Sequence, residues 1–299
     1  MSKNAIAIVG PKGGVGKSTI SANLAIAIAQ RGNKVTAVDL DLGGANLHIL
    51  LGIRQYKQSL DDFVLKKVKS LEEILIKTSI EGLQLICGGS NIPDIANMPF
   101  QQKMKLINHL LKLESDIVIL DLAAGSSFNV VDFVTIANQR LLVTSPEMTS
   151  LLKAYTFIKT CVFRLLTFHF KQTNASEVLE LLDMAKDPAA NPHLKTMDNI
   201  LTEAAKINPE SVAGAQEVLA MFKPNILLNM IQSKEDAKVA DVVQSMLKQY
   251  LGIFTGIVTA LPADPMVKKA VLQGKPVILA FPESEFAQAI RKLAGQCVS

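Results

Sequence analysis

A glycine-rich turn between a strand-like run and a helix-like run constrains the fold of this chain most. Residues 4–9 are almost all apolar, which is typical of a buried strand, and residues 17–31 are rich in Ala and Ile, which is typical of a buried helix. The turn between them is Gly10-Pro-Lys-Gly-Gly-Val-Gly-Lys-Ser18. Glycines let backbone N–H groups curl around an anion, and the N-terminus of the following helix adds its dipole. The sequence therefore predicts a phosphate-binding loop.

The loop matches a variant of the usual phosphate-binding pattern. The strict form, G-x-x-x-x-G-K-[ST], requires a glycine where this chain has Pro11. The loop instead fits K-G-G-x-G-K-[ST], in which Lys12 is an additional lysine. Lys17 can supply a charge to the β- and γ-phosphates, and the Ser18 hydroxyl can ligate Mg²⁺. The predicted nucleotide-binding residues of the loop are Gly13, Gly14, Val15, Gly16, Lys17, Ser18 and Thr19.

Strand-like runs alternate with helical patterns along most of the chain. Several strands are continuous apolar runs, as expected for parallel strands covered on both faces. The predicted strands are 5–9, 34–40, 83–87, 116–122, 140–144, 226–230 and 254–259. The predicted helices include 60–77, 101–113, 234–250 and 283–293. This alternation predicts an α/β fold, a doubly wound, mostly parallel sheet flanked by helices, in one domain over residues 1–299.

Residues 167–223 interrupt the alternation and predict a helical insertion. Prolines at 188, 192 and 209 divide this segment into short helical patterns with no strand among them. Aromatic residues gather at and just before its start: Tyr155, Phe157, Phe163, Phe168 and Phe170. We expect the insertion to cover this aromatic helix. The alternative is an apolar docking surface for a partner or a lipid face.

Carboxylates mark the ends of two predicted strands. Asp39 and Asp41 are two residues apart, so they would point the same way if the strand continued. Asp121 ends a run of four apolar residues, which is a Walker B pattern that reaches Mg²⁺ through water. Because ligands bind at the carboxyl ends of parallel strands, we expect these groups beside the loop. There they can hold the Mg²⁺ shell or orient a water for attack on the γ-phosphate.

Composition argues against several other classes of protein. The net charge of +4 does not by itself indicate nucleic-acid or membrane binding. Cys87, Cys161 and Cys297 are far apart, so we expect neither a disulfide framework nor an iron–sulfur site within one chain, and a reducing cytoplasm fits. We expect no signal peptide and no transmembrane helix. The chain has no Asn-Lys-x-Asp guanine motif, which favours ATP over GTP.

The loop, Asp39, Asp41 and Asp121 together resemble the deviant-Walker ATPases of the MinD/ParA group, and within it the MinD and FlhG/FleN-like proteins. The resemblance covers residues 3–159 and about 224–293. Three segments carry its detail. Residues 38–52 (VDLDLGGANLHILLG) look like the switch I segment, residues 144–150 (TSPEMTS) are similar to the FlhG segment after the fifth strand, and residues 261–264 (LPAD) with 274–277 (GKPV) resemble the adenine-side loop.

The resemblance implies a role for each matching residue. Lys12 would reach across an ATP-dependent homodimer to the partner's phosphates, and Asp41 would position the attacking water, so that the expected catalytic residues are Lys12, Lys17 and Asp41. The residues expected to hold Mg²⁺, partly through water, are Ser18, Asp39 and Asp121. Those expected to contact the adenine of ATP or ADP are Asn229, Pro262 and Asp264.

The resemblance also implies a slow, partner-stimulated ATPase. Such a dimerisation switch would position or regulate a flagellum, the division apparatus or other polar machinery, with the activating protein unidentified. The expected location is the cytoplasm, including the inner face of the membrane, although we see no clear membrane-targeting tail. DNA binding is not indicated.

The chain departs from the family pattern at Pro11, at residues 122–125, which lack the usual small polar residue, and in its insertion. Three other functions stay open at this point. A ParA-like DNA-partitioning ATPase would need a basic face and salt-sensitive DNA binding. A metal-cluster carrier of the nitrogenase iron-protein type would need a cysteine pair at a dimer interface. A non-catalytic nucleotide-binding scaffold would not need the intact catalytic residues.

Overall fold

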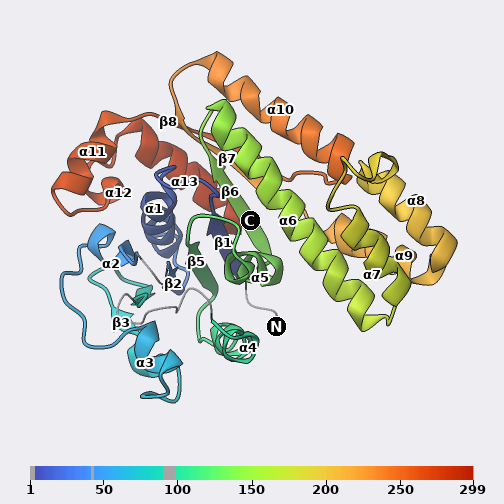
Figure 1. Ribbon diagram of the computed structural model, residues 1–299. Coiled ribbons are helices and arrows are strands. Elements are labelled where there is room, and N and C mark those ends of the chain that lie inside the picture. Colours follow the sequence, from blue (N-terminus) through green and yellow to red (C-terminus); the bar gives the residue numbers. More distant parts are fainter. Residues whose placement is uncertain (1–3, 42–43, 90–97, 299) are drawn as a thin grey trace.

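An eight-stranded sheet forms the centre of the molecule (Figure 1). The computed structural model describes residues 4–41, 44–89 and 98–298. The strand order is β3-β4-β2-β5-β1-β6-β7-β8, and every neighbouring pair is parallel except β3 with β4. The strands are β1 Asn4–Val9, β2 Val35–Leu40, β3 Ile76–Lys77, β4 Leu83–Ile86, β5 Ile117–Leu122, β6 Gln139–Thr144, β7 Asn225–Ile231 and β8 Val258–Pro262. The predicted doubly wound, mostly parallel sheet is confirmed.

Helices cover both faces of this sheet, so each face has its own apolar core (Figure 1). On β1, Ile6 and Ile8 belong to one core, whereas Ala7 and Val9 belong to the other, as expected for a strand buried on both sides. The helices are α1 Lys17–Ala29, α2 Leu47–Leu50, α3 Leu60–Val64, α4 Phe100–Leu110, α5 Phe128–Ile136, α6 Met148–Gln172, α7 Ser176–Met184, α8 Met197–Ile207, α9 Pro209–Met221, α10 Lys234–Leu251, α11 Pro265–Leu272, α12 Val277–Ala280 and α13 Glu285–Val298.

The helix that follows the glycine loop, α1, is buried on nearly all sides. Its residues Ile20, Leu24 and Ile28 have no exposed surface, because α1 lies between the sheet and α13. A helix that is apolar all round is expected to be buried in this way. The position of the loop is therefore fixed by a helix that cannot shift without disturbing the core.

The segment 60–77, predicted as one helix, forms three short elements instead. The helix α3 starts at Ser59, whose hydroxyl accepts a hydrogen bond from the Asp61 N–H, and its last turn is followed by Lys66 in the left-handed region (φ 61°). A 3₁₀ turn (Glu72–Ile74) and the short strand β3 complete the segment. The prediction was wrong because a left-handed residue ends a helix even where the apolar spacing continues.

The last strand begins later than predicted. Gly252 ends α10 in the left-handed conformation, and the chain then runs without regular structure to Val258. Phe254, the predicted start of the strand, is 60% exposed. An apolar residue favours a strand in the sequence, but the Phe254 side chain lies outside the core.

Between β6 and β7 the chain forms the long helix α6, then α7, a 3₁₀ turn (Pro192–Leu194), α8 and α9 (Figure 1). The helices α7 and α9 pack against α6, and Phe157, Phe163 and Phe170 of α6 are buried. The expectation that this aromatic helix is covered is confirmed for these three residues, whereas Tyr155 and Phe168 are only partly buried. The His169 side chain also bonds the Ser211 carbonyl (Nε2–O 2.7 Å), which joins α6 to α9.

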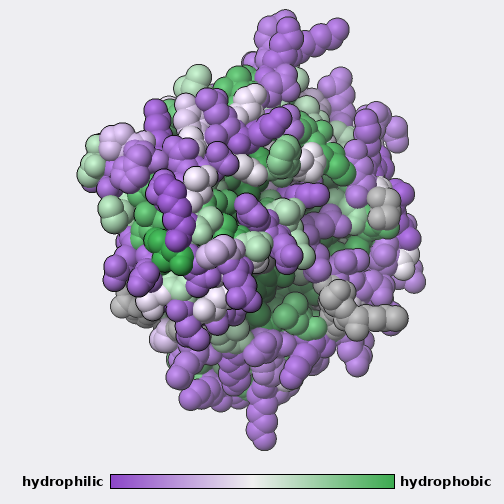
Figure 2. Space-filling view, turned by 90° about the vertical axis from the view of Figure 1, so that its right-hand side faces the viewer, coloured by the Kyte–Doolittle hydropathy of each residue, from purple (hydrophilic) through white to green (hydrophobic). Residues whose placement is uncertain are grey.

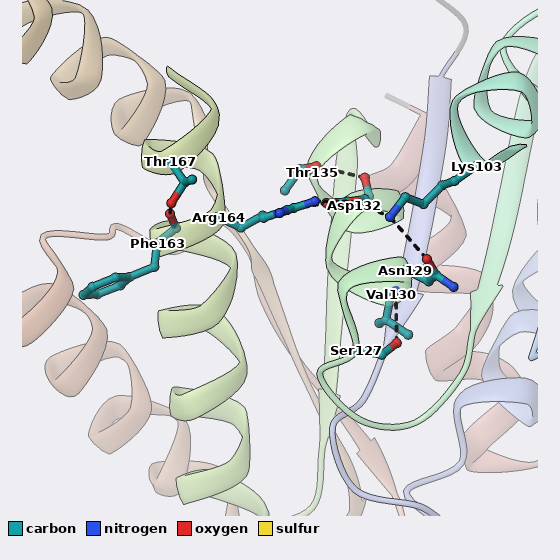
Figure 3. A network of polar contacts seen from close by, with 9 residues as sticks. All are labelled: Lys103, Ser127, Asn129, Val130, Asp132, Thr135, Phe163, Arg164 and Thr167. Carbon is teal, nitrogen blue, oxygen red and sulfur yellow. Dashed lines mark hydrogen bonds and ion pairs between the residues drawn. The ribbon is translucent and has the colours of Figure 1, made fainter. Parts of the chain in front are cut away.

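A mostly buried ionic network joins three helices on one face of the sheet (Figure 3). Arg164 of α6 donates two hydrogen bonds to the Asp132 carboxylate of α5 (Nε–Oδ1 2.8 Å, Nη2–Oδ2 3.1 Å). Lys103 of α4 forms an ion pair with the same carboxylate and donates to Asn129 Oδ1 at 3.2 Å. Arg164 also lies over the Phe128 ring. One carboxylate thus holds two cations from different helices.

The surface on the side of α7, α8 and α9 is mainly hydrophilic (Figure 2). Figure 2 shows polar side chains around most of this face, with apolar side chains in a hollow near its centre. Within the ranges that the structure describes, none of the helices combines the length and the apolar character needed to cross a bilayer.

Replacing Asp132 should strongly destabilise the fold. Asp132→Ala leaves the Lys103 and Arg164 cations without their shared carboxylate, and breaking a buried ion pair costs about 3–5 kcal/mol. Urea denaturation measures the loss in the free energy of unfolding. Asp183→Ala is the matched control, because Asp183 pairs with Lys186 at the surface and its loss should cost under about 1 kcal/mol. Equal effects of the two variants would contradict a structural role for the network.

Candidate nucleotide-binding site

A pocket of ≈ 850 Å³ lies at the carboxyl ends of the strands, where ligands of open α/β sheets bind. Its wall includes ten of the residues predicted from the sequence: Gly13, Gly14, Gly16, Lys17, Ser18, Thr19, Asp41, Asn229, Pro262 and Asp264. The other predicted residues, Lys12, Val15, Asp39 and Asp121, are not part of the wall. Val15, Asp39 and Asp121 are buried, whereas Lys12 is partly exposed.

Two glycines of the loop are required by its geometry. A Cβ atom at Gly10 would lie 2.8 Å from Val15 Cγ2 and 2.9 Å from the Val143 carbonyl of β6. Gly16 is left-handed (φ 91°) and precedes the first residue of α1. The close approach to β6 thus occurs at residue 10. This accounts for a glycine there rather than at residue 11, where the strict pattern places it.

The Lys17 side chain carries a buried positive charge at the pocket. Lys17 is 8% exposed, and burial lowers the pKa of its ammonium group, while the negative charges of Asp121 and Asp41 oppose this shift. The N-terminus of α1 adds a positive partial charge at the same place. Together these groups form a site suited to a polyanion such as a phosphate chain.

Asp39 and Asp121 lie opposite each other on the neighbouring strands β2 and β5, and each is 1% exposed. Burial, with repulsion from Asp121, raises the pKa of Asp39 to about 7. Burial raises the pKa of Asp121 to about 6, although the Ser18 and Ser21 hydroxyls and Lys17 lower it. Two adjacent buried carboxyl groups with raised pKa values indicate a place that a cation would stabilise.

The surroundings of Asp121 fit a magnesium ion. Its Oδ1 accepts a hydrogen bond from the Ser21 hydroxyl at 2.8 Å, whereas Oδ2 is buried and has no hydrogen-bond partner among the described residues. Ser18, which lines the pocket, is close enough to lower the pKa of Asp121. Mg²⁺ prefers oxygen ligands and commonly combines one or two carboxylates with water and phosphate oxygens. The hydroxyl of Ser18 and the free oxygen of Asp121 match that donor set.

Asp39 mainly anchors the segment that follows β2. Its Oδ1 accepts from the Asp41 N–H (3.1 Å), and its Oδ2 accepts from the N–H groups of Asn46 (2.9 Å) and Leu47 (3.0 Å). The strand ends at Leu40, so the alternation that would align Asp39 with Asp41 stops there. Asp41 therefore lies at the pocket wall while Asp39 is buried beneath it.

Lys12 forms an ion pair with Glu147, the residue that precedes α6. The two side chains are 32% and 61% exposed, so this pair is at the surface. Sequence reasoning did not single out Glu147, although it lies within the TSPEMTS segment on which the resemblance rests. Lys12, the additional lysine of this variant loop, thus pairs with a residue that is not part of the pocket wall.

The pocket wall also includes the residues predicted to contact adenine, Asn229, Pro262 and Asp264. Asp264 starts α11 and accepts hydrogen bonds from the N–H groups of Met266 (2.8 Å) and Phe286 (3.1 Å), so its carboxylate holds this loop in place. Several apolar wall residues were not anticipated: Ile49, Leu50, Met230, Val267 and Val271. Nothing in the sequence distinguishes such residues from those that face the core.

The stability of the metal-free protein should fall as the pH rises from about 4 to about 7. The folded-state pKa values of Asp39 and Asp121, about 7 and about 6, exceed the ordinary value of 3.8. In this window the folded state binds more protons than the unfolded state, so the free energy of unfolding decreases until both carboxyl groups are ionised. Urea denaturation in EDTA at several pH values measures the decline.

Asp39→Asn should flatten this decline, because asparagine resembles the protonated form. Asp183→Asn is the control, since Asp183 is an exposed surface residue and its replacement should leave the profile unchanged. A pH profile of Asp39→Asn parallel to that of the wild type would contradict the raised pKa of Asp39.

Comparison of this chain with known proteins identifies its family. Residues 6–277 match the family described as the CobQ/CobB/MinD/ParA nucleotide binding domain. The antiactivator FleN of Pseudomonas aeruginosa is 28% identical over 97% of this chain and 84% of its own length. The septum site-determining protein MinD of Helicobacter pylori is 30% identical over 97% of this chain and 90% of its own length.

A solved structure of MinD from Pyrococcus horikoshii, complexed with Mg-ADP, is similar to the fold of this chain with a TM-score of 0.66. It covers 99% of this chain and 96% of its own length at 23% identity. The predicted resemblance is confirmed, and with it the ATPase class and its nucleotide cofactor. The chain belongs to the CobQ/CobB/MinD/ParA nucleotide-binding family.

Proposed function

We propose that this chain is an ATP-driven dimerisation switch of the MinD/FlhG type that positions or regulates a cellular structure, such as a flagellum, the division apparatus or other polar machinery. The observation that carries the proposal is the different placement of two lysines in one loop. Lys17 lines the pocket and is buried, whereas Lys12 is outside the pocket wall and partly exposed. The similarity to the antiactivator FleN and to MinD supports the regulatory role.

Breaking the ion pair between Lys12 and Glu147 costs little free energy. A surface pair such as Lys12 with Glu147 contributes about 0–1 kcal/mol. A triphosphate presents a larger negative charge, so Lys12 can leave Glu147 when a second copy presents its bound nucleotide. We infer that the site of one protomer is completed by Lys12 of another. Hydrolysis would then depend on dimerisation.

The other site residues have roles that follow from their positions. Lys17 and the loop N–H groups would hold the β- and γ-phosphates, and Ser18 and Asp121 would hold Mg²⁺, which neutralises phosphate charge when bound. Asp41 lies at the pocket wall, whereas the carboxylate of Asp39 is buried. Asp41 is therefore the carboxylate that would orient the attacking water.

The alternative functions are less well supported. A ParA-like DNA-partitioning ATPase is less favoured because the two relatives reported above, FleN and MinD, each match over nearly the whole chain and neither is a partitioning protein by name. In a metal-cluster carrier the thiols must be accessible at a shared interface, whereas Cys87, Cys161 and Cys297 are all buried. A scaffold without activity would not need Asp41 at the pocket wall.

Two substitutions should separate dimerisation from hydrolysis. Lys12→Ala should abolish ATP hydrolysis, with a loss of at least about 100-fold, because a charge that stabilises the transferred phosphoryl group is removed. Asp41→Ala should bind ATP but not hydrolyse it, and should accumulate as an ATP-bound dimer. Phosphate release and light scattering after size exclusion measure the two effects.

Lys206→Ala serves as the control, because Lys206 is an exposed surface lysine paired with Glu203 and should leave both properties unchanged. Normal ATP hydrolysis by Asp41→Ala would show that the water-positioning role is wrong. Hydrolysis by Lys12→Ala at the wild-type rate would remove the basis for a shared site.

The trapped dimer also distinguishes the proposed switch from the DNA-partitioning alternative. We expect ATP-bound Asp41→Ala not to co-sediment with double-stranded DNA at physiological salt, because DNA binding of that kind requires a basic face and falls steeply with salt. Sedimentation with DNA that disappears as salt is raised would favour the ParA-like alternative. A parallel assay with anionic liposomes tests association with the membrane surface.

A further inference from the structure

We propose that Asn229 is a positioning residue that holds the phosphate-binding loop in its binding shape, a role additional to the adenine contact predicted from the resemblance. The inference rests on the proposed nucleotide site and concerns how the empty loop is kept ready for phosphate. Asn229 is near the end of β7, 214 residues after the loop residue that it contacts.

The side-chain amide of Asn229 is packed directly against the loop. Its Nδ2 donates a hydrogen bond to the Val15 carbonyl at 2.8 Å, and Asn229 is only 6% exposed. A Cβ atom at Gly16 would lie 2.4 Å from the same Nδ2 atom. The amide thus fixes the peptide between Val15 and Gly16, at the point where the loop turns into α1. The adjacent residues Gly16, Lys17 and Ser18 form part of the pocket wall.

The residue after Asn229 has an unusual backbone conformation. Met230 has φ 63°, in the left-handed region that few residues other than glycine adopt. The pairing of β7 with β8 shifts register between Leu228 and Ile231, so the strand is irregular at this point. Strained backbone of this kind persists where the surrounding structure requires it, and it is often found at functional sites. We attribute the strain to the placement of the Asn229 amide under the loop.

The two roles of Asn229 predict different results for a ligand that has no base. An amide that only contacts adenine would affect the binding of ATP but not that of inorganic tripolyphosphate. An amide that holds the loop would affect both ligands, because both bind through the same N–H groups. Magnesium tripolyphosphate therefore serves as the probe, with ATP as the comparison.

The main experiment measures the affinity of both ligands by calorimetry for the wild type, Asn229→Ala and Asn225→Ala. Asn225 is the matched control, because it lies on the same strand and accepts a hydrogen bond from the Ile257 N–H away from the pocket. For Asn229→Ala we expect a loss of about 2- to 13-fold for tripolyphosphate, the range for one hydrogen bond, and at least as large a loss for ATP. Asn225→Ala should match the wild type. A loss for ATP alone would overturn the positioning role.

One further variant keeps the test decisive if Asn229→Ala does not fold. Asn229→Asp preserves the shape but replaces the donor with an acceptor facing the Val15 carbonyl, so tripolyphosphate affinity should fall about 10-fold or more. Unchanged affinity in Asn229→Asp would overturn the inference. Failure of the wild type to bind tripolyphosphate would instead overturn the proposed phosphate site itself.

Discussion

The close approach of the loop backbone to strands β6 and β7 is the constraint on which the site depends. Gly10 lies against the Val143 carbonyl, and Gly16 lies against the Asn229 amide, so neither position has room for a Cβ atom. These contacts hold the loop against the carboxyl ends of the strands before any ligand binds. The N–H groups of the loop and the N-terminus of α1 are thereby preorganised for phosphate, and less of the binding energy is lost in ordering them.

The same edge of the sheet holds charges that are unfavourable without a ligand. Lys17, Asp39 and Asp121 are all buried there, and the pKa of each is shifted toward its neutral form. Bound phosphate and Mg²⁺ would compensate these charges, so ligand binding should relieve an electrostatic cost that the empty protein carries. The two apolar cores on either side of the sheet supply the stability that allows such a site.

Much of the fold could be predicted from the sequence because its parallel strands are continuous apolar runs and its loop is bounded by a strand and a buried helix. The segment 60–77 could not, since the left-handed Lys66 breaks a helix whose apolar spacing continues. At the site, residue types indicated Lys17, Asp41 and Asp121. Two sets of hydrogen bonds could not be predicted: those of Asp39 to the segment after β2, and that of Asn229 to the loop. They depend on where a strand ends or becomes irregular, and a local sequence pattern does not show this.

The ionic network on one face connects the helix that follows Asp121 to the long helix α6. The helix α5 begins shortly after Asp121 and carries Asp132, which binds Arg164 of α6 through two hydrogen bonds. The helices α7 and α9 pack on the same helix α6. A shift of α5 must therefore either carry α6 with it or break a mostly buried ion pair, and breaking such a pair costs several kcal/mol. The segment that follows Asp121 is thus joined through α5 and α6 to the helices α7 and α9, although they lie far apart in the sequence.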